Sequence, residues 1–357
     1  MSERALEIRV GPTAARRLAE EGWHPELISG LLGASGGPKW LILGYLDRAI
    51  SERLLSSRAS PLHAVGSSIG SWRHAMLAQP DAVAAIDRFE AVYLEQHYSE
   101  KPTVEEITAV SRELLLVALG DGGATNIAHH PWFHSHIVTA RGKGLNNRTT
   151  GAALAVGLGL AAVGNAVSRQ TLPVSFQRVV FAHQAAQPLK DFLAGFNTHY
   201  AHLTADNVPD ALMASGAIPY VFSGVCDVPG GPSGAYWDGG IIDYHFDVAG
   251  LPSEGLWLYP HFSKRATVGW FDKLLPWRAG RSAMADNLIM LCPSDAFIRQ
   301  LPHGKIPDRR DFTAMTPSAR QKYWRHCVAQ SQRLADEFHR LVTGSDPLNG
   351  VIKMQSR

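Results

Sequence analysis

The sequence predicts a three-layered α/β protein with a mostly parallel central sheet and helices on both faces. Two observations predict this class. The first is two apolar runs of strand length, at residues 27–34 and 62–65. The second is apolar residues at helical spacing after each run, within 38–55 and after Ser68. Such strand–helix alternation is typical of a parallel sheet covered by helices.

The individual elements follow from local patterns. A helix is expected from Pro38 to about Leu55, because proline suits the first helical turn, where its missing N–H has no partner anyway. A second helix is expected from Ile69 to about Gln79 and ends at Pro80. Three further runs are expected to be buried strands and two to be helices: 136–140, 178–182 and 256–259, then 207–215 and 318–342.

We expect a single domain over residues 1–357, since no repeat, low-complexity stretch or clear linker divides the chain. Two helical segments are expected within it, an insertion near 145–175 and a C-terminal segment over 310–345. The small-residue run 152–167 is too short and too rich in glycine to span a bilayer comfortably. We expect a buried helix there rather than a lipid-binding lid.

Composition excludes several classes of protein. The chain is 45% apolar and 18% charged, as in ordinary globular proteins, and its net charge of +2 gives no broad electrostatic case for nucleic acid. Its three cysteines are far apart in the sequence, which favours a reducing compartment over a disulfide framework or a zinc site. The N-terminus has no apolar core of signal-peptide length. These features predict a soluble cytoplasmic protein.

The strongest local signal is Gly66-Ser67-Ser68-Ile69-Gly70, a G-x-S-x-G segment between a predicted strand and a predicted helix. A sharp turn at this junction exposes the serine, and the positions two residues away must be small because strand and helix nearly touch. The helix N-terminus also favours negative charge that develops nearby. The pentapeptide is common by chance, but its context is the required one. Ser68 is therefore the candidate nucleophile.

A second glycine turn, Ser35-Gly36-Gly37-Pro38-Lys39, also joins a strand to a helix. Glycines let bare backbone N–H groups face a ligand, as an oxyanion hole requires, although a phosphate-binding turn or a simple tight connection has the same composition. A right-handed crossover places this turn and the Ser68 turn at the carboxyl ends of neighbouring parallel strands. The amides of Gly36 and Gly37 and the Ser68 hydroxyl are therefore expected to flank one point.

The third signal is Tyr236-Trp237-Asp238-Gly239-Gly240. Asp-Gly is common in hairpin turns, and this simpler reading remains open from the residues alone. A free aspartate, with a pKa of about 3.9, is a poor base at neutral pH. Desolvation beside apolar groups such as Trp237 and Ile241 raises such a pKa and makes Asp238 a candidate base.

Four segments of the chain, taken in order, together resemble the patatin-like phospholipase family: SGGPK, GSSIG, ASGAIPYVF at 214–222, and DGG. The resemblance implies a patatin-like fold and a lipid acyl hydrolase that acts on phospholipids or other acyl-lipid esters, without a metal or other cofactor. It implies a Ser68–Asp238 dyad without histidine, and an acyl-enzyme that water hydrolyses. It also implies an oxyanion hole formed by Gly36, Gly37 and Ile69. The supporting positions that it implies are Lys39, Gly66, Gly70, Gly239 and Gly240.

Three alternatives remain open at this stage. The scaffold also suits an acyltransferase that passes the acyl group to an alcohol or thiol. Ser68 with a histidine such as His245 or His261 would make an ordinary α/β-hydrolase triad. A non-catalytic lipid- or protein-binding module is the third alternative.

Two further groups of side chains have simpler interpretations. Four histidines at 129, 130, 134 and 136 match no fixed metal-ligand spacing, so we expect a loop entering a strand and no metal. Aromatic and basic residues alternate over 270–281, which suits peripheral contact with a membrane surface, although a helix packed on the core has the same pattern. The residues concerned are Trp270, Phe271, Lys273, Leu274, Leu275, Trp277, Arg278 and Arg281.

Overall fold

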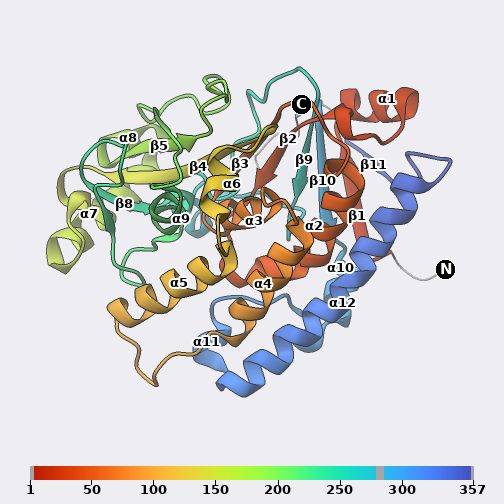
Figure 1. Ribbon diagram of the computed structural model, residues 1–357. Coiled ribbons are helices and arrows are strands. Elements are labelled where there is room, and N and C mark those ends of the chain that lie inside the picture. Colours follow the sequence, from red (N-terminus) through yellow and green to blue (C-terminus); the bar gives the residue numbers. More distant parts are fainter. Residues whose placement is uncertain (1–3, 279–284, 355–357) are drawn as a thin grey trace.

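The computed structural model describes residues 4–278 and 285–354, and their strands join one mixed sheet (Figure 1). The strand order is β11-β1-β10-β9-β2-β3-β4-β5-β6, with β8 paired to β4 and β7 to β8. The central strands β10, β9, β2, β3 and β4 run parallel, whereas β1–β10, β4–β5, β4–β8 and β7–β8 are antiparallel. A mostly parallel sheet with helices around it confirms the predicted α/β class.

The strands are β1 Leu6–Val10, β2 Ile28–Gly33, β3 Leu62–Ser67, β4 Phe133–Gly142, β5 Phe176–Ala182, β6 His199–His202, β7 Val225–Cys226, β8 Ala235–Asp238, β9 Leu256–Pro260, β10 Leu288–Pro293 and β11 Ile352–Lys353. The α-helices are α1 Pro12–Glu21, α2 Gly44–Ile50, α3 Ile69–Leu77, α4 Ala82–Glu95, α5 Val104–Leu119, α6 Gly123–Ala128, α7 Gly151–Val167, α8 Leu172–Ser175, α9 Val208–Gly216, α10 Asp295–Gln300, α11 Asp311–Ala314 and α12 Pro317–Thr343.

The predicted helix over 38–55 is in fact three consecutive pieces. A 3₁₀-helix over Gly37–Leu43 leads into α2, which continues as a π-helix over Ser51–Leu55. The side chains of residues 40–43 are all buried, so this stretch lacks the exposed face of a regular amphipathic helix. Trp40 stacks on Phe89 of α4 with ring centroids 4.3 Å apart, so tertiary packing has overridden the simple helical period.

Strand register determines which chain segments meet at the carboxyl end of the central strands. Gly33 of β2 pairs with Gly66 of β3, and Ser67 pairs with Val138 of β4. On the same stretch of β4, Thr139 pairs with Asp238 at the end of β8. The segments that follow β2, β3 and β8 therefore converge, although they are far apart in the sequence.

The expectation of a buried helix at 152–167 is correct for only one face of α7. Its inner face packs on a small apolar cluster that includes Trp237, Ile241 and Phe271. Its outer face carries four apolar side chains that are between 53% and 82% exposed: Val156, Leu160, Val163 and Val167. The helix lies at the end of the molecule far from α12 (Figure 1). No helix of the described residues is long and apolar enough to cross a membrane.

Candidate active site

Ser68 lies on a strained turn between β3 and α3. Its backbone angles are φ 55° and ψ −131°, a region that residues other than glycine rarely adopt and that is enriched at functional sites. The start of α3 touches the neighbouring strand β2, since a Cβ added to Gly70 would lie 2.0 Å from the Gly33 carbonyl oxygen. One added to Gly66 would lie 2.7 Å from the Ser71 backbone. The glycines at both ends of the pentapeptide are therefore required by close packing.

The Ser68 side chain and backbone are both held by hydrogen bonds. Its Oγ donates to Asp238 Oδ2 at 2.7 Å, and its backbone N–H donates to Ser215 Oγ at 2.8 Å. The fully buried Ser215 hydroxyl donates in turn to the Val138 carbonyl at 2.7 Å. Ser215 thus ties the turn to β4, and it belongs to the ASGAIPYVF segment that sequence reasoning recorded without giving this serine a role.

Asp238 is a buried carboxylate at the end of β8. Its backbone N–H donates to the Ala217 carbonyl at 2.8 Å, and its Oδ1 accepts from the Gly240 N–H at 2.7 Å. Among residues 4–278 and 285–354, no lysine, arginine or histidine lies within ion-pair distance of it. Burial raises the pKa of Asp238, and the hydrogen bonds from Ser68 and Gly240 partly oppose this rise. A raised pKa makes the carboxylate a better proton acceptor near neutral pH.

The glycine turn after β2 faces the same pocket. Gly37, with φ +55°, is the first residue of its 3₁₀-helix, and Ile69 is the first residue of α3. The first N–H groups of a helix have no acceptor within it and remain available to a ligand. Ser35 Oγ donates to Ser67 Oγ at 3.1 Å, which links the turn to β3. Lys39 Nζ lies 5.0 Å from the centre of the Phe262 ring.

A pocket of about 500 Å³ opens at this convergence. Of the residues predicted from the sequence, its wall contains Gly36, Gly37, Lys39, Ser68, Asp238 and Gly240. The others are neighbours of Ser68 or Asp238 in the chain. Gly239, for example, packs so closely on β4 that a Cβ would lie 2.2 Å from the Val138 carbonyl oxygen. The structure therefore brings together the three segments that carry the predicted residues.

Sequence reasoning missed part of the pocket wall. Tyr244, Arg309 and Arg310 line it without belonging to any recognised motif. Lys273 and Trp270 also line it, whereas the sequence had suggested membrane contact or a helix packed on the core for their segment. In the same segment Phe271 and Leu275 are buried and Trp277 is 58% exposed, while Arg281 lies outside the described residues.

The histidines considered from the sequence have other partners. His245 Nδ1 accepts from the Thr267 N–H at 2.9 Å, and His261 Nδ1 accepts from the Ser263 N–H at 2.9 Å. Within the described ranges neither histidine is hydrogen-bonded to Ser68 or Asp238.

The histidine-rich segment runs from a loop into β4, as expected. His134 stacks on His183 with ring centroids 4.7 Å apart, and His136 Nε2 is 2.9 Å from His63 Nδ1. In the part of the chain that the structure describes, no three histidine, cysteine or acidic side chains are grouped as metal ligands would be.

Comparisons with known proteins agree with the motif order. A family model described as patatin-like phospholipase matches residues 34–245, more than half of the chain. The matched range includes every site residue predicted from the sequence. No curated protein matches. A crystal structure of VipD from Legionella pneumophila aligns at 13% identity over 99% of this chain and 75% of that chain, with a TM-score of 0.34.

Proposed function

The chain belongs to the patatin-like phospholipase family and is therefore a lipid hydrolase. We propose that it cleaves acyl-lipid esters with a dyad formed by Ser68 and Asp238. The 2.7 Å hydrogen bond from Ser68 Oγ to a buried carboxylate is the observation that carries this proposal. The base is in direct contact with the nucleophile, so the pair needs no intervening histidine.

The chemistry follows from this contact. Ser68 Oγ attacks the ester carbonyl carbon while its proton passes to Asp238. The amides of Gly36, Gly37 and Ile69 stabilise the negative charge that develops on the carbonyl oxygen. The leaving alcohol then takes the proton from Asp238, which leaves the acyl group on Ser68. Water attacks this acyl-enzyme with Asp238 as base, and the free fatty acid departs as Ser68 regains its proton.

The pocket has a wall suited to the acyl part of such an ester. Ile218, Pro219, Ile241 and Trp270 line the same pocket as Ser68. An acyl chain that contacts these side chains is removed from water. Each methylene buried in this way contributes about 0.8 kcal/mol to the free energy of binding. The carbonyl carbon of the chain would then lie at the nucleophile.

The decisive test is the loss of turnover and of covalent labelling in Ser68→Ala. Wild-type protein is expected to react with a fluorophosphonate probe at Ser68 and to release fatty acid from a panel of phospholipids, lysophospholipids and acylglycerols. Ser68→Ala loses both signals, whereas Ser56→Ala at an exposed position keeps them. Normal turnover in Ser68→Ala would reject the dyad.

The same assay separates the alternatives. Added alcohols or thiols that divert the acyl group into a new ester would identify a transferase. Loss of turnover in His245→Ala or His261→Ala, with folding retained, would favour a triad. A wild-type protein that the probe does not label would be a binding module.

We also propose that the outer face of α7 contacts a lipid surface. The helix carries no charged side chain. Val174 of α8, a helix that contacts α7, is also apolar and 80% exposed. The inner face of α7 belongs to the same apolar cluster as Ile241, which also lines the catalytic pocket. A lipid surface at α7 would therefore adjoin the pocket.

Vesicle co-sedimentation tests this contact. The double variant Leu160→Glu with Val163→Glu is expected to lower the bound fraction about tenfold or more, because two carboxylates must be desolvated at the interface. The control Ala329→Glu places one such carboxylate on the exposed face of α12 and keeps wild-type binding. Equal binding by all three proteins would contradict the contact.

A further inference from the structure

The rim of the catalytic pocket carries four cationic side chains. Lys39 comes from the 3₁₀-helix after β2, Lys273 from the 3₁₀-helix over Phe271–Leu274, and Arg309 and Arg310 from the loop before α11. Besides Asp238, the wall has one acidic residue, Asp308. Segments from three distant parts of the sequence thus bring positive charge to one opening.

None of these four cations has an acidic partner among the described residues. Lys273 Nζ lies 3.3 Å from the centre of the Tyr244 ring, as Lys39 lies over Phe262. Asp308 is engaged elsewhere, since its Oδ1 accepts from the Arg310 backbone N–H and its Oδ2 is 3.6 Å from Lys305 Nζ. Within the described residues, the four cations at the rim are therefore not neutralised by ion pairs.

Two buried arginines elsewhere in the molecule are paired with carboxylates. Arg73 binds both carboxylate oxygens of Asp47 at 2.6 and 2.8 Å, and Arg178 binds both of Asp243 at 2.6 and 2.9 Å. Gathering like charges without partners costs free energy through mutual repulsion. Burial lowers the pKa of Lys273 to about 7, and the charges of Lys39 and Arg309 add to this fall. An anion bound at the rim would remove this cost.

The cations lie beside the reacting groups. The Arg309 side chain packs over the glycine turn, since a Cβ on Gly37 would lie 3.2 Å from Arg309 Cγ. An anion held at this rim therefore lies next to the proposed oxyanion site, on the same pocket wall. In a phospholipid, the phosphate is separated from the acyl ester by only a few bonds.

We propose that Lys273, Arg309 and Arg310, with Lys39, form a subsite for the phosphate of an acyl ester whose headgroup is net anionic. The guanidinium of arginine matches phosphate oxygens with two parallel hydrogen bonds. A zwitterionic headgroup would bring its own ammonium group to a rim that is already positive, whereas an anionic headgroup adds no such repulsion. This inference rests on the proposed function and adds a headgroup preference to it.

The test compares monomeric short-chain substrates, so that contact with a lipid surface plays no part. Dihexanoyl esters with phosphate monoester, phosphoglycerol and phosphocholine headgroups are assayed below their micellar concentrations. Wild-type kcat/KM is expected to be about tenfold or more higher for the two anionic substrates than for phosphocholine, and the ratio shrinks as salt rises. A ratio near one at low salt would overturn the proposal.

Variants locate the preference. Lys273→Gln with Arg309→Gln is expected to lower the anionic-to-zwitterionic ratio about tenfold, mainly through KM of the anionic substrates. Lys322→Gln with Arg340→Gln makes the same charge changes at exposed positions of α12 and keeps the wild-type ratio. An unchanged ratio in the rim variant would assign the preference to other groups and reject this subsite.

A binding measurement separates this inference from the catalytic one. Calorimetric titration of Ser68→Ala with inorganic phosphate is expected to show saturable binding that the rim variant weakens at least tenfold. If wild-type protein hydrolyses no ester, the proposed function fails and the phosphate titration alone decides the subsite. If hydrolysis occurs without phosphate binding or headgroup preference, only the subsite fails.

Discussion

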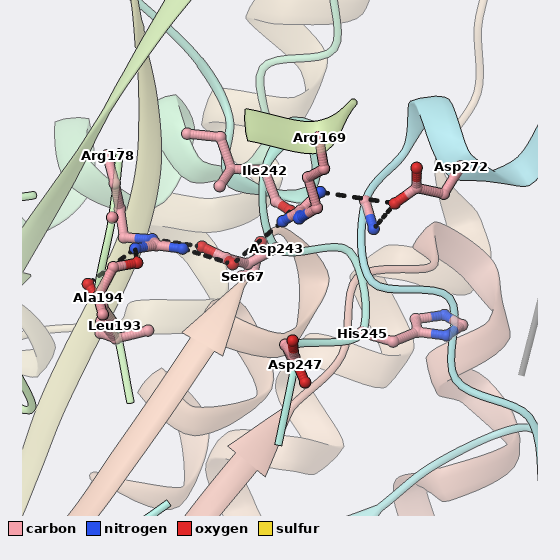
Figure 2. Close-up of polar contacts among 12 residues, drawn as sticks. Ser67, Arg169, Arg178, Leu193, Ala194, Ile242, Asp243, His245, Asp247 and Asp272 are labelled. Carbon is pink, nitrogen blue, oxygen red and sulfur yellow. Dashed lines mark hydrogen bonds and ion pairs between the residues drawn. The ribbon is translucent and has the colours of Figure 1, made fainter. Parts of the chain in front are cut away.

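Asp238 and Asp243 are buried in the same short segment after β8, yet they are stabilised in different ways. Asp238 accepts one hydrogen bond from Ser68 and one from a backbone amide, and no cation contacts it. Asp243 accepts two hydrogen bonds from the Arg178 guanidinium, at 2.6 and 2.9 Å (Figure 2). The comparison shows two ways of stabilising a buried carboxylate: hydrogen bonds without an ion pair at Asp238, and a two-point ion pair with a guanidinium at Asp243.

The pair at Asp243 is part of a larger polar cluster behind the pocket. Arg178 also donates to the carbonyls of Leu193 and Ala194, and Arg169 lies between Asp243 and Asp272 (Figure 2). This cluster connects β5 to the segment that carries Ile241 and Tyr244 of the pocket wall. Asp243 thus holds the scaffold together, whereas Asp238 is free for chemistry.

The largest expected effect is on turnover in Asp238→Asn. The amide cannot accept the Ser68 proton, so kcat is expected to fall about 10³-fold or more. The variant should be at least as stable as wild type at neutral pH, because it removes a buried charge that has no ionic partner. Ester turnover and urea unfolding at pH 7 measure the two quantities. Retained turnover would show that Asp238 is not the base. A large loss of stability would show that it stabilises the fold, as Asp243 does.

The converse variant is Asp243→Asn. It leaves the buried Arg178 guanidinium without its carboxylate, so the free energy of unfolding is expected to fall by about 3–5 kcal/mol. Asp47→Asn, which breaks the buried pair with Arg73 elsewhere in the molecule, should cost a similar amount. Turnover by the remaining folded protein is expected to fall far less than in Asp238→Asn. A thousandfold loss of kcat would show that Asp243 also takes part in the chemistry.

The pH dependence of turnover sharpens the same contrast. Only the ionised form of Asp238 accepts a proton, and burial raises its pKa above the ordinary value of 3.8. The rate is therefore expected to fall as pH falls through this raised pKa, with a midpoint above 3.8. The acid limb should persist in Asp243→Asn. A midpoint at or below 3.8 would contradict a buried carboxylate that has no ion-pair partner among the described residues.

The same shift has a defined sign for stability. Because the folded state of Asp238 binds a proton more readily than the unfolded state, its contribution favours folding at low pH. This contribution is lost as pH rises from the unfolded value through the folded pKa. As pH rises over that interval, the wild-type protein should therefore lose stability relative to Asp238→Asn.

Local patterns predicted much of the fold and the core of the candidate site. Apolar runs and helical spacing located β2, β3 and α3, and the glycines around Ser68 marked the turn because strand–helix contact there is a local requirement. Asp238 was harder, since Asp-Gly also suits a hairpin, and only its order among the other motifs singled it out.

What the sequence did not predict depends on long-range placement. Arg309 and Arg310 reach the pocket from a loop without periodicity, so no local pattern links them to Ser68. The exposed face of α7 was missed because an apolar composition does not say which side of a helix is covered. The pair of Arg178 with Asp243 joins β5 to a loop and has no sequence signature.

The smallest expected effect is that of Arg169→Gln. Arg169 donates to the Ile242 carbonyl at 2.5 Å, but its guanidinium is 3.9 Å from Asp243 and 3.5 Å from Asp272, and its side chain is 25% exposed. Asp243 keeps both hydrogen bonds from Arg178 in this variant, so the free energy of unfolding should fall by only about 1 kcal/mol. Urea unfolding measures this loss. Arg17→Gln, which removes an exposed ion pair with Glu21, is measured in parallel as a comparison for the size of the effect. A loss as large as that of Asp243→Asn would show that Arg178 alone does not neutralise Asp243, and that this aspartate requires two cations whereas Asp238, the proposed base, forms no ion pair with a described residue.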